Sequence, residues 1–137
     1  MTRPIPETTH AAVLRADFSD DAAWAAICDQ IRAPSGDFVA TVECVNDRSF
    51  EGLTPSQVPE LVRPGAPHTF LFLVDQRTIA DPEHPVVVVD LYAEPGRSFR
   101  VIPSEMWGVE NNLSLANMDF DEFADSADAD GVFRGFA

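Results

Sequence analysis

Residues 69–91 read TFLFLVDQRTIADPEHPVVVVDL, two short apolar runs on either side of a polar segment. Each run, at 69–75 and at 86–91, has the length of a strand and an uninterrupted apolar centre. Strands of this kind are covered on both faces, unlike strands in which apolar and polar residues alternate. The stretch therefore predicts two strands near the middle of a sheet, with other elements packed on each side.

The segment before this stretch has the pattern of a strand, a helix and a second strand. Residues 12–16 are largely apolar, and residues 38–45 are rich in β-branched side chains. Between them Ser19 is a suitable N-cap, and apolar residues recur at helical spacing on one face. These residues are Trp24, Ile27, Cys28 and Ile31. The pattern predicts a βαβ unit with a right-handed crossover.

Two further signals flank the central stretch. Residues 54–57, TPSQ, form a capping box with proline at the first helical position, so a short helix is expected to about residue 62. Residues 94–97, EPGR, have the composition of a tight turn. Residues 98–102 are therefore expected to return as the second strand of a hairpin.

The C-terminal part has a mostly helical pattern. One helix is expected to start near residue 103 and to contain Trp107. Residues 113–116 fit either a continuation of this helix or a short extended piece. Asp119 is expected to cap a last helix that presents three residues on one face, namely Phe120, Phe123 and Ala124.

These elements predict an α+β or α/β fold, a single mixed sheet of about five strands with helices packed on it. The length of 137 residues fits one domain, residues 1–137. Residues 1–10 contain two prolines and no periodicity, so we expect a loose N-terminal lead-in. The tail, residues 125–137, is acidic and then aromatic, and Phe133 and Phe136 are expected to pack back onto the domain.

The composition is strongly acidic: 23 acidic and 9 basic residues give a formal net charge of −14, and lysine is absent. Proteins that bind nucleic acids or anionic membranes present basic surfaces, so neither class of partner is expected. Without lysine, P-loop phosphate binding and Schiff-base chemistry are excluded. An acidic field favours a basic protein as partner, because it speeds their association.

The sequence also predicts where the protein resides. No apolar run is long enough to span a membrane, and the first ten residues lack the apolar centre of a signal peptide. Cys28 and Cys44 match no metal-binding or redox motif and are expected to be reduced thiols. We therefore expect a cytoplasmic protein without a cofactor.

Three aspartates, Asp17, Asp75 and Asp90, follow predicted strands. Ligands of open α/β sheets bind beyond the carboxyl ends of the strands. If the three strands are parallel neighbours, these carboxylates would meet and could hold a divalent cation. The alternative interpretation is that aspartate simply ends strands and begins turns.

Residues typical of binding surfaces are densest between 97 and 112. Tryptophan and arginine dominate interface hot spots, and asparagine offers directed donors and acceptors. The interaction candidates are Arg97, Arg100, Glu105, Trp107, Glu110, Asn111 and Asn112. The alternative is that Trp107 is buried and that the asparagines cap helix ends.

Motifs of enzymatic catalysis are absent from the sequence. There is no GxSxG turn and no catalytic-cysteine signature, and His10, His68 and His84 are scattered. We assign no catalytic, cofactor-binding or metal-binding residue and expect a binding protein rather than an enzyme. A small enzyme or a ligand- or cation-binding domain that uses the strand-end carboxylates is the alternative.

Five segments resemble a family of small acidic proteins, mainly from high-GC actinobacteria, whose function is not known. They are VLRADFSDDAAW (13–24), DPEHPVVVVDL (81–91), PGRSFRVIPSEMW (95–107), NNLSLANMDFDEFAD (111–125) and GVFRGF (131–136). The resemblance spans about residues 12–136 and implies no catalytic residue.

Residues 117–123, NMDFDEF, are similar to the closing helix of the SUKH superfamily of immunity proteins, with Asp119 in place of the usual serine cap. In that superfamily the helix packs on a mixed sheet, and the proteins neutralise toxins. The similarity implies an immunity- or accessory-type module. We expect a non-enzymatic domain that binds a basic protein such as a nuclease toxin.

Overall fold

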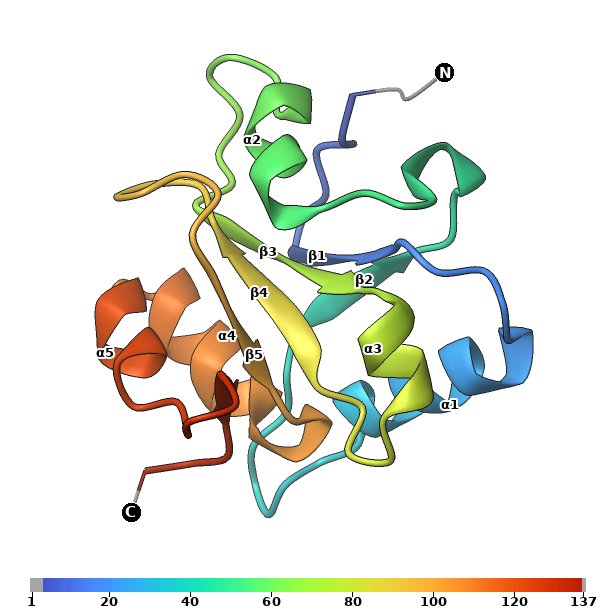
Figure 1. Ribbon diagram of the computed structural model, residues 1–137. Coiled ribbons are helices and arrows are strands. Elements are labelled where there is room, and N and C mark those ends of the chain that lie inside the picture. Colours follow the sequence, from blue (N-terminus) through green and yellow to red (C-terminus); the bar gives the residue numbers. More distant parts are fainter. Residues whose placement is uncertain (1–3, 137) are drawn as a thin grey trace.

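The computed structural model describes residues 4–136, so residues 1–3 of the lead-in and Ala137 of the tail lie outside the described residues. Its centre is a six-stranded mixed sheet in the order β2-β1-β3-β4-β5-β6 (Figure 1). The strands are β1 (Ala11–Arg15), β2 (Val42–Val45), β3 (Phe70–Val74), β4 (Val86–Asp90), β5 (Ser98–Val101) and β6 (Val132–Phe133). The α-helices are α1 (Asp21–Arg32), α2 (Val58–Leu61), α3 (Gln76–Ala80), α4 (Met106–Ser114) and α5 (Phe120–Ala124). The predicted α+β fold with one mixed sheet is confirmed.

The N-terminal half forms the predicted parallel unit. Strand β1 pairs in parallel with β2 on one side and with β3 on the other. Helix α1 connects β1 to β2 and buries the apolar face expected from its spacing. The buried residues are Trp24, Ile27, Cys28 and Ile31.

Strands β3, β4 and β5 pair antiparallel, and β4 and β5 form the predicted hairpin. The turn at 94–97 needs glycine because Gly96 has φ +93°, a conformation that residues with a Cβ rarely adopt. The Gly96 N–H donates to the Asp90 carbonyl at 2.9 Å, and the Asp90 N–H donates to the Arg97 carbonyl at 2.8 Å. The turn therefore fixes the register of the hairpin.

Alternate residues of the central strands fill two separate cores, which explains their continuous apolar runs. Phe70 and Phe72 of β3 belong to one core with residues of α1, α4 and α5. Leu71 and Leu73 of the same strand belong to the other core, which α2 and the N-terminal segment close. In Figure 1, α2 lies above the sheet, and α1, α4 and α5 lie below it. Each large apolar side chain buried in this way stabilises the fold by about 1.5–3 kcal/mol.

Two boundaries in the βαβ unit differ from the prediction. Asp20, and not Ser19, caps α1, because its carboxylate accepts a hydrogen bond from the Ala23 N–H at 2.9 Å. Ser19 is instead held by Asp17, whose carboxylate accepts from the Ser19 N–H at 3.0 Å. The strand predicted over 38–45 begins only at Val42, because a turn at Ser35–Phe38 folds the chain back.

The sheet has six strands and not about five, because the tail adds β6. Two residues are too short for a recognisable period, so the sequence pattern does not predict this strand. Strand β6 pairs in parallel with β5, and the Arg100 N–H donates to the Gly131 carbonyl at 2.9 Å. Phe133 is buried, whereas Phe136 is 57% exposed although its ring contacts Phe123 and Phe133.

The structure also decides the open alternative at 113–116. Helix α4 continues to Ser114, and Ala116 then takes a positive φ of +55° that ends it.

In the N-terminal lead-in, Ile5 is buried and its N–H donates to the Leu61 carbonyl at 2.9 Å. No helix within residues 4–136 is both long enough and apolar enough to cross a membrane.

Candidate functional site

The strand-end aspartates do not meet in one place. Parallel pairing of β1 and β3 brings Asp17 and Asp75 to the same end of the sheet. Strand β4 is antiparallel to β3 and pairs Asp90 with Phe70, so Asp90 lies at the opposite end. No group of three or more His, Cys, Asp and Glu side chains among residues 4–136 is placed to hold a metal ion. The condition under which these three carboxylates would meet, three parallel neighbouring strands, is therefore not fulfilled.

Two of these aspartates serve the local backbone. Asp17 accepts from the Ser19 N–H just before α1. Asp90 is 2% exposed, and its carboxylate accepts from the Tyr92 N–H at 2.9 Å and the Glu94 N–H at 2.8 Å. The interpretation that aspartate here ends strands and begins turns accounts for both residues.

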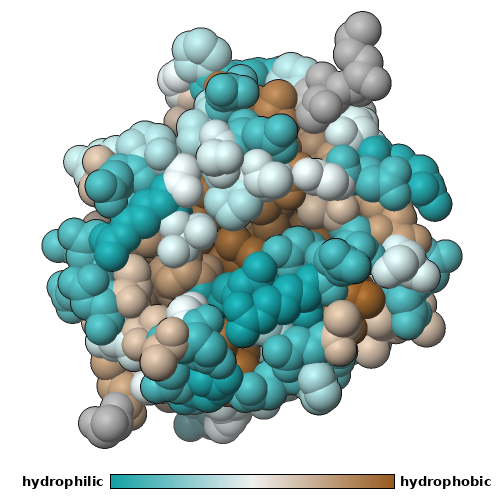
Figure 2. Space-filling model, viewed as in Figure 1, coloured by the Kyte–Doolittle hydropathy of each residue, from teal (hydrophilic) through white to brown (hydrophobic). Residues whose placement is uncertain are grey.

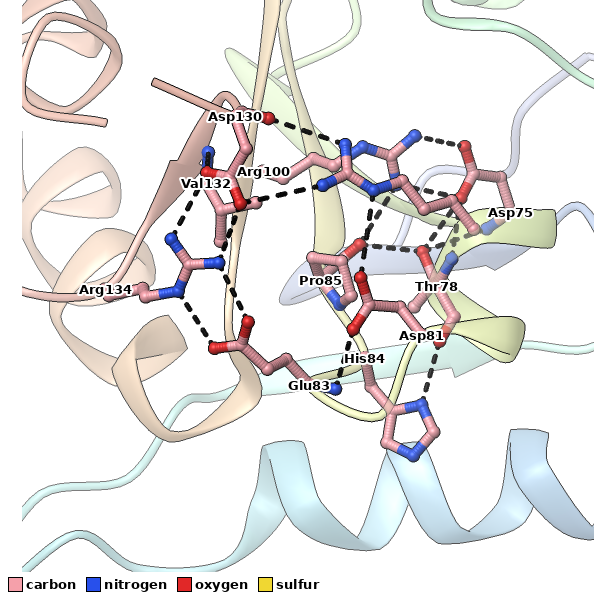
Figure 3. Close-up of polar contacts among 11 residues, drawn as sticks. Asp75, Thr78, Asp81, Glu83, His84, Pro85, Arg100, Asp130, Val132 and Arg134 are labelled. Atoms are coloured by element: carbon pink, nitrogen blue, oxygen red, sulfur yellow. Dashed lines mark hydrogen bonds and ion pairs between the residues drawn. The ribbon is translucent and has the colours of Figure 1, made fainter. Parts of the chain in front are cut away.

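Asp75 combines a capping role with an ion pair (Figure 3). It caps α3 by accepting from the Thr78 N–H at 3.1 Å, and the two terminal Arg100 nitrogens donate to its oxygens at 2.9 and 2.7 Å. Burial alone would raise the pKa of Asp75. The hydrogen bonds from Arg100 and Thr78 outweigh burial and hold this pKa below its usual value.

Beside this pair, Arg134 binds three carboxylates of the tail and of the loop before β4. It contacts Glu83 and Asp130 at 2.8 Å and Asp128 at 2.7 Å, and its hydrogen bonds lower the pKa of Glu83 and of Asp130. Figure 2 shows a hydrophilic band over α3 and β5, where the contacts of Figure 3 lie. These charged groups satisfy one another, and their arrangement joins the tail to the sheet.

Four of the interaction candidates make contacts within the molecule. Arg97 pairs with Asp121 and with Asp125, which joins the β4–β5 hairpin to α5. Of the remaining three, Arg100 pairs with Asp75, and the Glu105 carboxylate lies close to Gly135. The Asn112 side chain donates to the Gly108 carbonyl.

The other three candidates, Trp107, Glu110 and Asn111, lie on α4 and contact the loop at 34–41. The Phe38 ring stacks on Trp107 with 4.6 Å between the ring centroids and 14° between the ring planes. Phe38 is nevertheless 54% exposed and Val39 is 43% exposed. We call the surface formed by Phe38, Val39, Trp107 and Asn111 the Trp107 patch.

Directed hydrogen bonds hold this loop on α4. The Asn111 amide donates to the Val39 carbonyl at 3.1 Å and to the Trp107 carbonyl at 2.6 Å. Glu110 is 5% exposed and accepts from the Thr41 N–H at 2.6 Å and from the Ser114 hydroxyl at 2.7 Å. Hydrogen bonds to α4 therefore order the backbone that carries the exposed side chains Phe38 and Val39 of the Trp107 patch.

A groove of about 830 Å³ lies at the end of the sheet where β1 and β3 begin. Phe70, Met118 and Phe120 contribute apolar side chains to its lining, and no arginine lines it. Asp119 also lines it, and so does Tyr92, which is 80% exposed. Its size and lining are those of a small-molecule or side-chain binding site.

With this geometry described, a comparison with known families places the chain. The model of a family described as a domain of unknown function, DUF6924, matches residues 10–136. The chain belongs to the DUF6924 family. The match covers all six strands of the sheet, the Trp107 patch and most of the groove. No curated protein matches this DUF6924 chain.

Sequence reasoning missed part of both surfaces of the DUF6924 chain. It placed Phe38 and Val39 in a strand, because residues 38–42 contain no glycine or proline that would separate these two residues from the strand that follows. The groove gave no signal, because its walls come from four separate segments of the chain. They are residues 8–11, 67–70, 90–93 and 113–121.

Proposed function

We propose that the protein is an acidic, non-enzymatic binding module of the immunity or accessory type that acts in the cytoplasm. It binds a basic protein through the Trp107 patch. The observation that carries this proposal is the Phe38 ring, which stacks on Trp107 while more than half of its surface faces solvent.

The composition of the patch fits a protein interface. Aromatic residues are enriched at binding hot spots, where a large ring enters a pocket of the partner. The Asn111 and Glu110 hydrogen bonds already order the backbone that presents Phe38 and Val39. Because this order exists before binding, association loses less conformational entropy.

The charge of the molecule indicates the kind of partner. A net charge of −14 creates a field that attracts a basic protein and raises its association rate. Asp37, next to Phe38 in the sequence, is exposed and adds negative charge beside the patch. A basic partner can therefore combine an apolar contact at Phe38 with salt-dependent attraction at the rim.

The immunity-type assignment is supported by the similarity of residues 117–123 to the closing helix of SUKH proteins. In this chain α5 follows Asp119 and buries Phe120 and Phe123 against the core below the mixed sheet. A helix in this position agrees with what the resemblance implies.

The test is affinity capture with the purified chain, followed by measurement of Kd for the protein captured. A basic protein should bind at low salt, and its Kd should rise as salt is added. Phe38→Ser should weaken binding at least about tenfold, because it removes the anchor ring. Phe136→Ser is the matched control: it removes another exposed aromatic side chain, lies outside both the patch and the groove, and should leave Kd unchanged.

Three outcomes would contradict this function. The first is capture that is insensitive to salt, and the second is a captured protein that is not basic. The third is equal loss of affinity in the two variants, because the Trp107 patch would then have no special role in binding.

The groove favours a second candidate function, the binding of a small cationic ligand with an aromatic or apolar part. The apolar side chains of Phe70 and Phe120 line it, and Asp119 and Tyr92 can attract a cation by charge and by a cation–π contact. Asp90 also lines it, but both of its carboxylate oxygens are bonded to backbone N–H groups. Of the three strand-end carboxylates, only Asp90 lies in the groove.

Benzylamine and its neutral analogue benzyl alcohol are suitable probes. In NMR titrations, benzylamine should shift the resonances of Phe120 and Met118, and benzyl alcohol should shift them much less. Asp119→Asn removes the charge and keeps a good N-cap, so it should reduce the benzylamine effect without unfolding α5. Equal effects of the two probes would exclude a cation site.

A further inference from the structure

Strand β2 forms an edge of the sheet that no other segment of residues 4–136 pairs with. It is the outermost strand beside β1, and its backbone makes no hydrogen bond to any further part of the described chain. Three of its four residues, Glu43, Cys44 and Val45, are partly exposed. Since successive residues of a strand direct their N–H and C=O groups to opposite sides, about two residues of β2 direct both groups away from β1.

This open edge is continuous with the Trp107 patch. Phe38 and Val39 precede Val42, the first residue of β2, by only a few positions, so Phe38 lies at most about 14 Å from it. The short connection is ordered, because the Thr41 N–H donates to Glu110 at 2.6 Å. An extended segment of about seven residues, which spans about 23 Å, can therefore pair with β2 and also reach the Phe38 ring.

The charge of this region indicates which strand can add to the edge. Residues 37–47 contain three acidic side chains, Asp37, Glu43 and Asp47, and no basic one. A second copy of the chain would bring the same acidic segment and a further net charge of −14 to this edge, so pairing between two copies is opposed by repulsion. A basic strand would instead place opposite charges beside these carboxylates.

We propose that β2 is a docking edge for strand addition, at which an extended basic segment of the partner becomes the next strand of the sheet. The backbone groups of β2 provide the main-chain hydrogen bonds, and Phe38 and Val39 contact an apolar side chain of the same segment. This inference rests on the proposed function, because it takes the partner to be a basic protein, and it specifies how that partner binds.

The test uses the purified full chain and a synthetic peptide of seven residues that alternates valine with lysine or arginine. Main-chain bonds supply most of the affinity in strand addition, so a basic strand-forming peptide is a valid probe. It should bind with a Kd of about 1 mM or tighter at low salt, and added salt should raise the Kd. In amide hydrogen exchange followed by NMR, alternate residues of 42–45 should slow when the peptide binds, because the other amides already face β1.

Matched controls separate main-chain pairing from general attraction. The same peptide with its central amides N-methylated keeps its charge and cannot donate, so it should bind at least about tenfold more weakly. Glu43→Arg should raise the Kd of the unmethylated peptide about fivefold, since it places a positive charge on the edge strand. Glu94→Arg makes the same change of net charge on the exposed β4–β5 turn, several strands away, and should alter the Kd less than twofold.

Several results would overturn the docking edge. They are absence of peptide binding at millimolar concentration, equal binding of the methylated peptide, and dimers of the chain that protect the β2 amides without any peptide. A captured basic protein whose affinity depends on Phe38 but which leaves the β2 amides unchanged would also overturn it, and the proposed function would stand. Peptide pairing at β2 together with a captured protein that is insensitive to Phe38→Ser would contradict the Trp107 patch and leave the docking edge supported.

Discussion

Asp75 and Arg100 show that the main contact of a residue can remain hidden when only the sequence is known. Asp75 was predicted as a strand-end carboxylate and Arg100 as an interaction candidate, yet they form one ion pair. The pairing depends on the adjacent positions of β3, β4 and β5, and the two residues are 25 positions apart. Sequence patterns describe the local element and cannot report such a contact.

This pair makes the stability of the protein depend on pH. Because the pKa of folded Asp75 lies below its usual value, the stabilisation is present above about pH 4 and is lost as the pH falls through the folded pKa. Asp75→Asn should therefore lower the free energy of unfolding by about 2 kcal/mol at pH 7. The difference from the unsubstituted protein should shrink towards pH 2, as measured by urea unfolding.

Asp125→Asn is the control for this prediction, because it removes an exposed partner of Arg97. It should change stability little at any pH, as exposed ion pairs contribute little. An Asp75→Asn difference that stays constant or grows as the pH falls would contradict the role assigned to Asp75.

At the scale of the elements, the sequence predicted the longer and more periodic ones. The apolar face of α1 and the central strands β3 and β4 could be predicted, because burial leaves a regular pattern in the sequence. Strand β6 and the first residue of β2 could not be predicted from the sequence. Both depend on contacts with distant residues, β6 on strand β5 and the loop before β2 on Trp107.

The cap of α1 gives a direct test at this scale. Asp20→Ala should lower the free energy of unfolding by about 1 kcal/mol, because the Ala23 N–H loses its acceptor. Ser19→Ala should cost less, since Ser19 does not cap the helix. Thermal and urea unfolding of the two variants measures the difference. A larger loss of stability for Ser19→Ala would contradict this assignment and support Ser19 as the cap, as predicted from the sequence.

At the scale of the whole molecule, the candidate surfaces were only partly predictable. Trp107, Glu110 and Asn111 were identified from residue type, and the structure gathers them on one side of α4. Their partners Phe38 and Val39 were missed, because exposure is a property of the folded molecule and not of the local sequence. The net charge could be taken directly from the sequence, because it does not depend on where each residue lies in the fold.

The short strand β6 has a consequence for aggregation. A four-residue strand such as β5 with open N–H and C=O groups could pair with the same edge of another molecule. The two residues of β6 cover that edge and leave too little edge of their own for a further strand to extend. The tail therefore protects the β5 edge of the sheet from edge-to-edge assembly.

Phe133→Ser should detach β6 and cause the protein to assemble into larger soluble oligomers or fibrils, detected by light scattering and by thioflavin fluorescence. Circular dichroism should first establish that the variant keeps its secondary structure. Phe136→Ser, which alters the same aromatic cluster outside the strand, should not assemble further than the unsubstituted protein. Assembly of both variants or of neither would show that the last strand has no such role, whereas assembly of Phe133→Ser alone would identify it as a barrier to self-association.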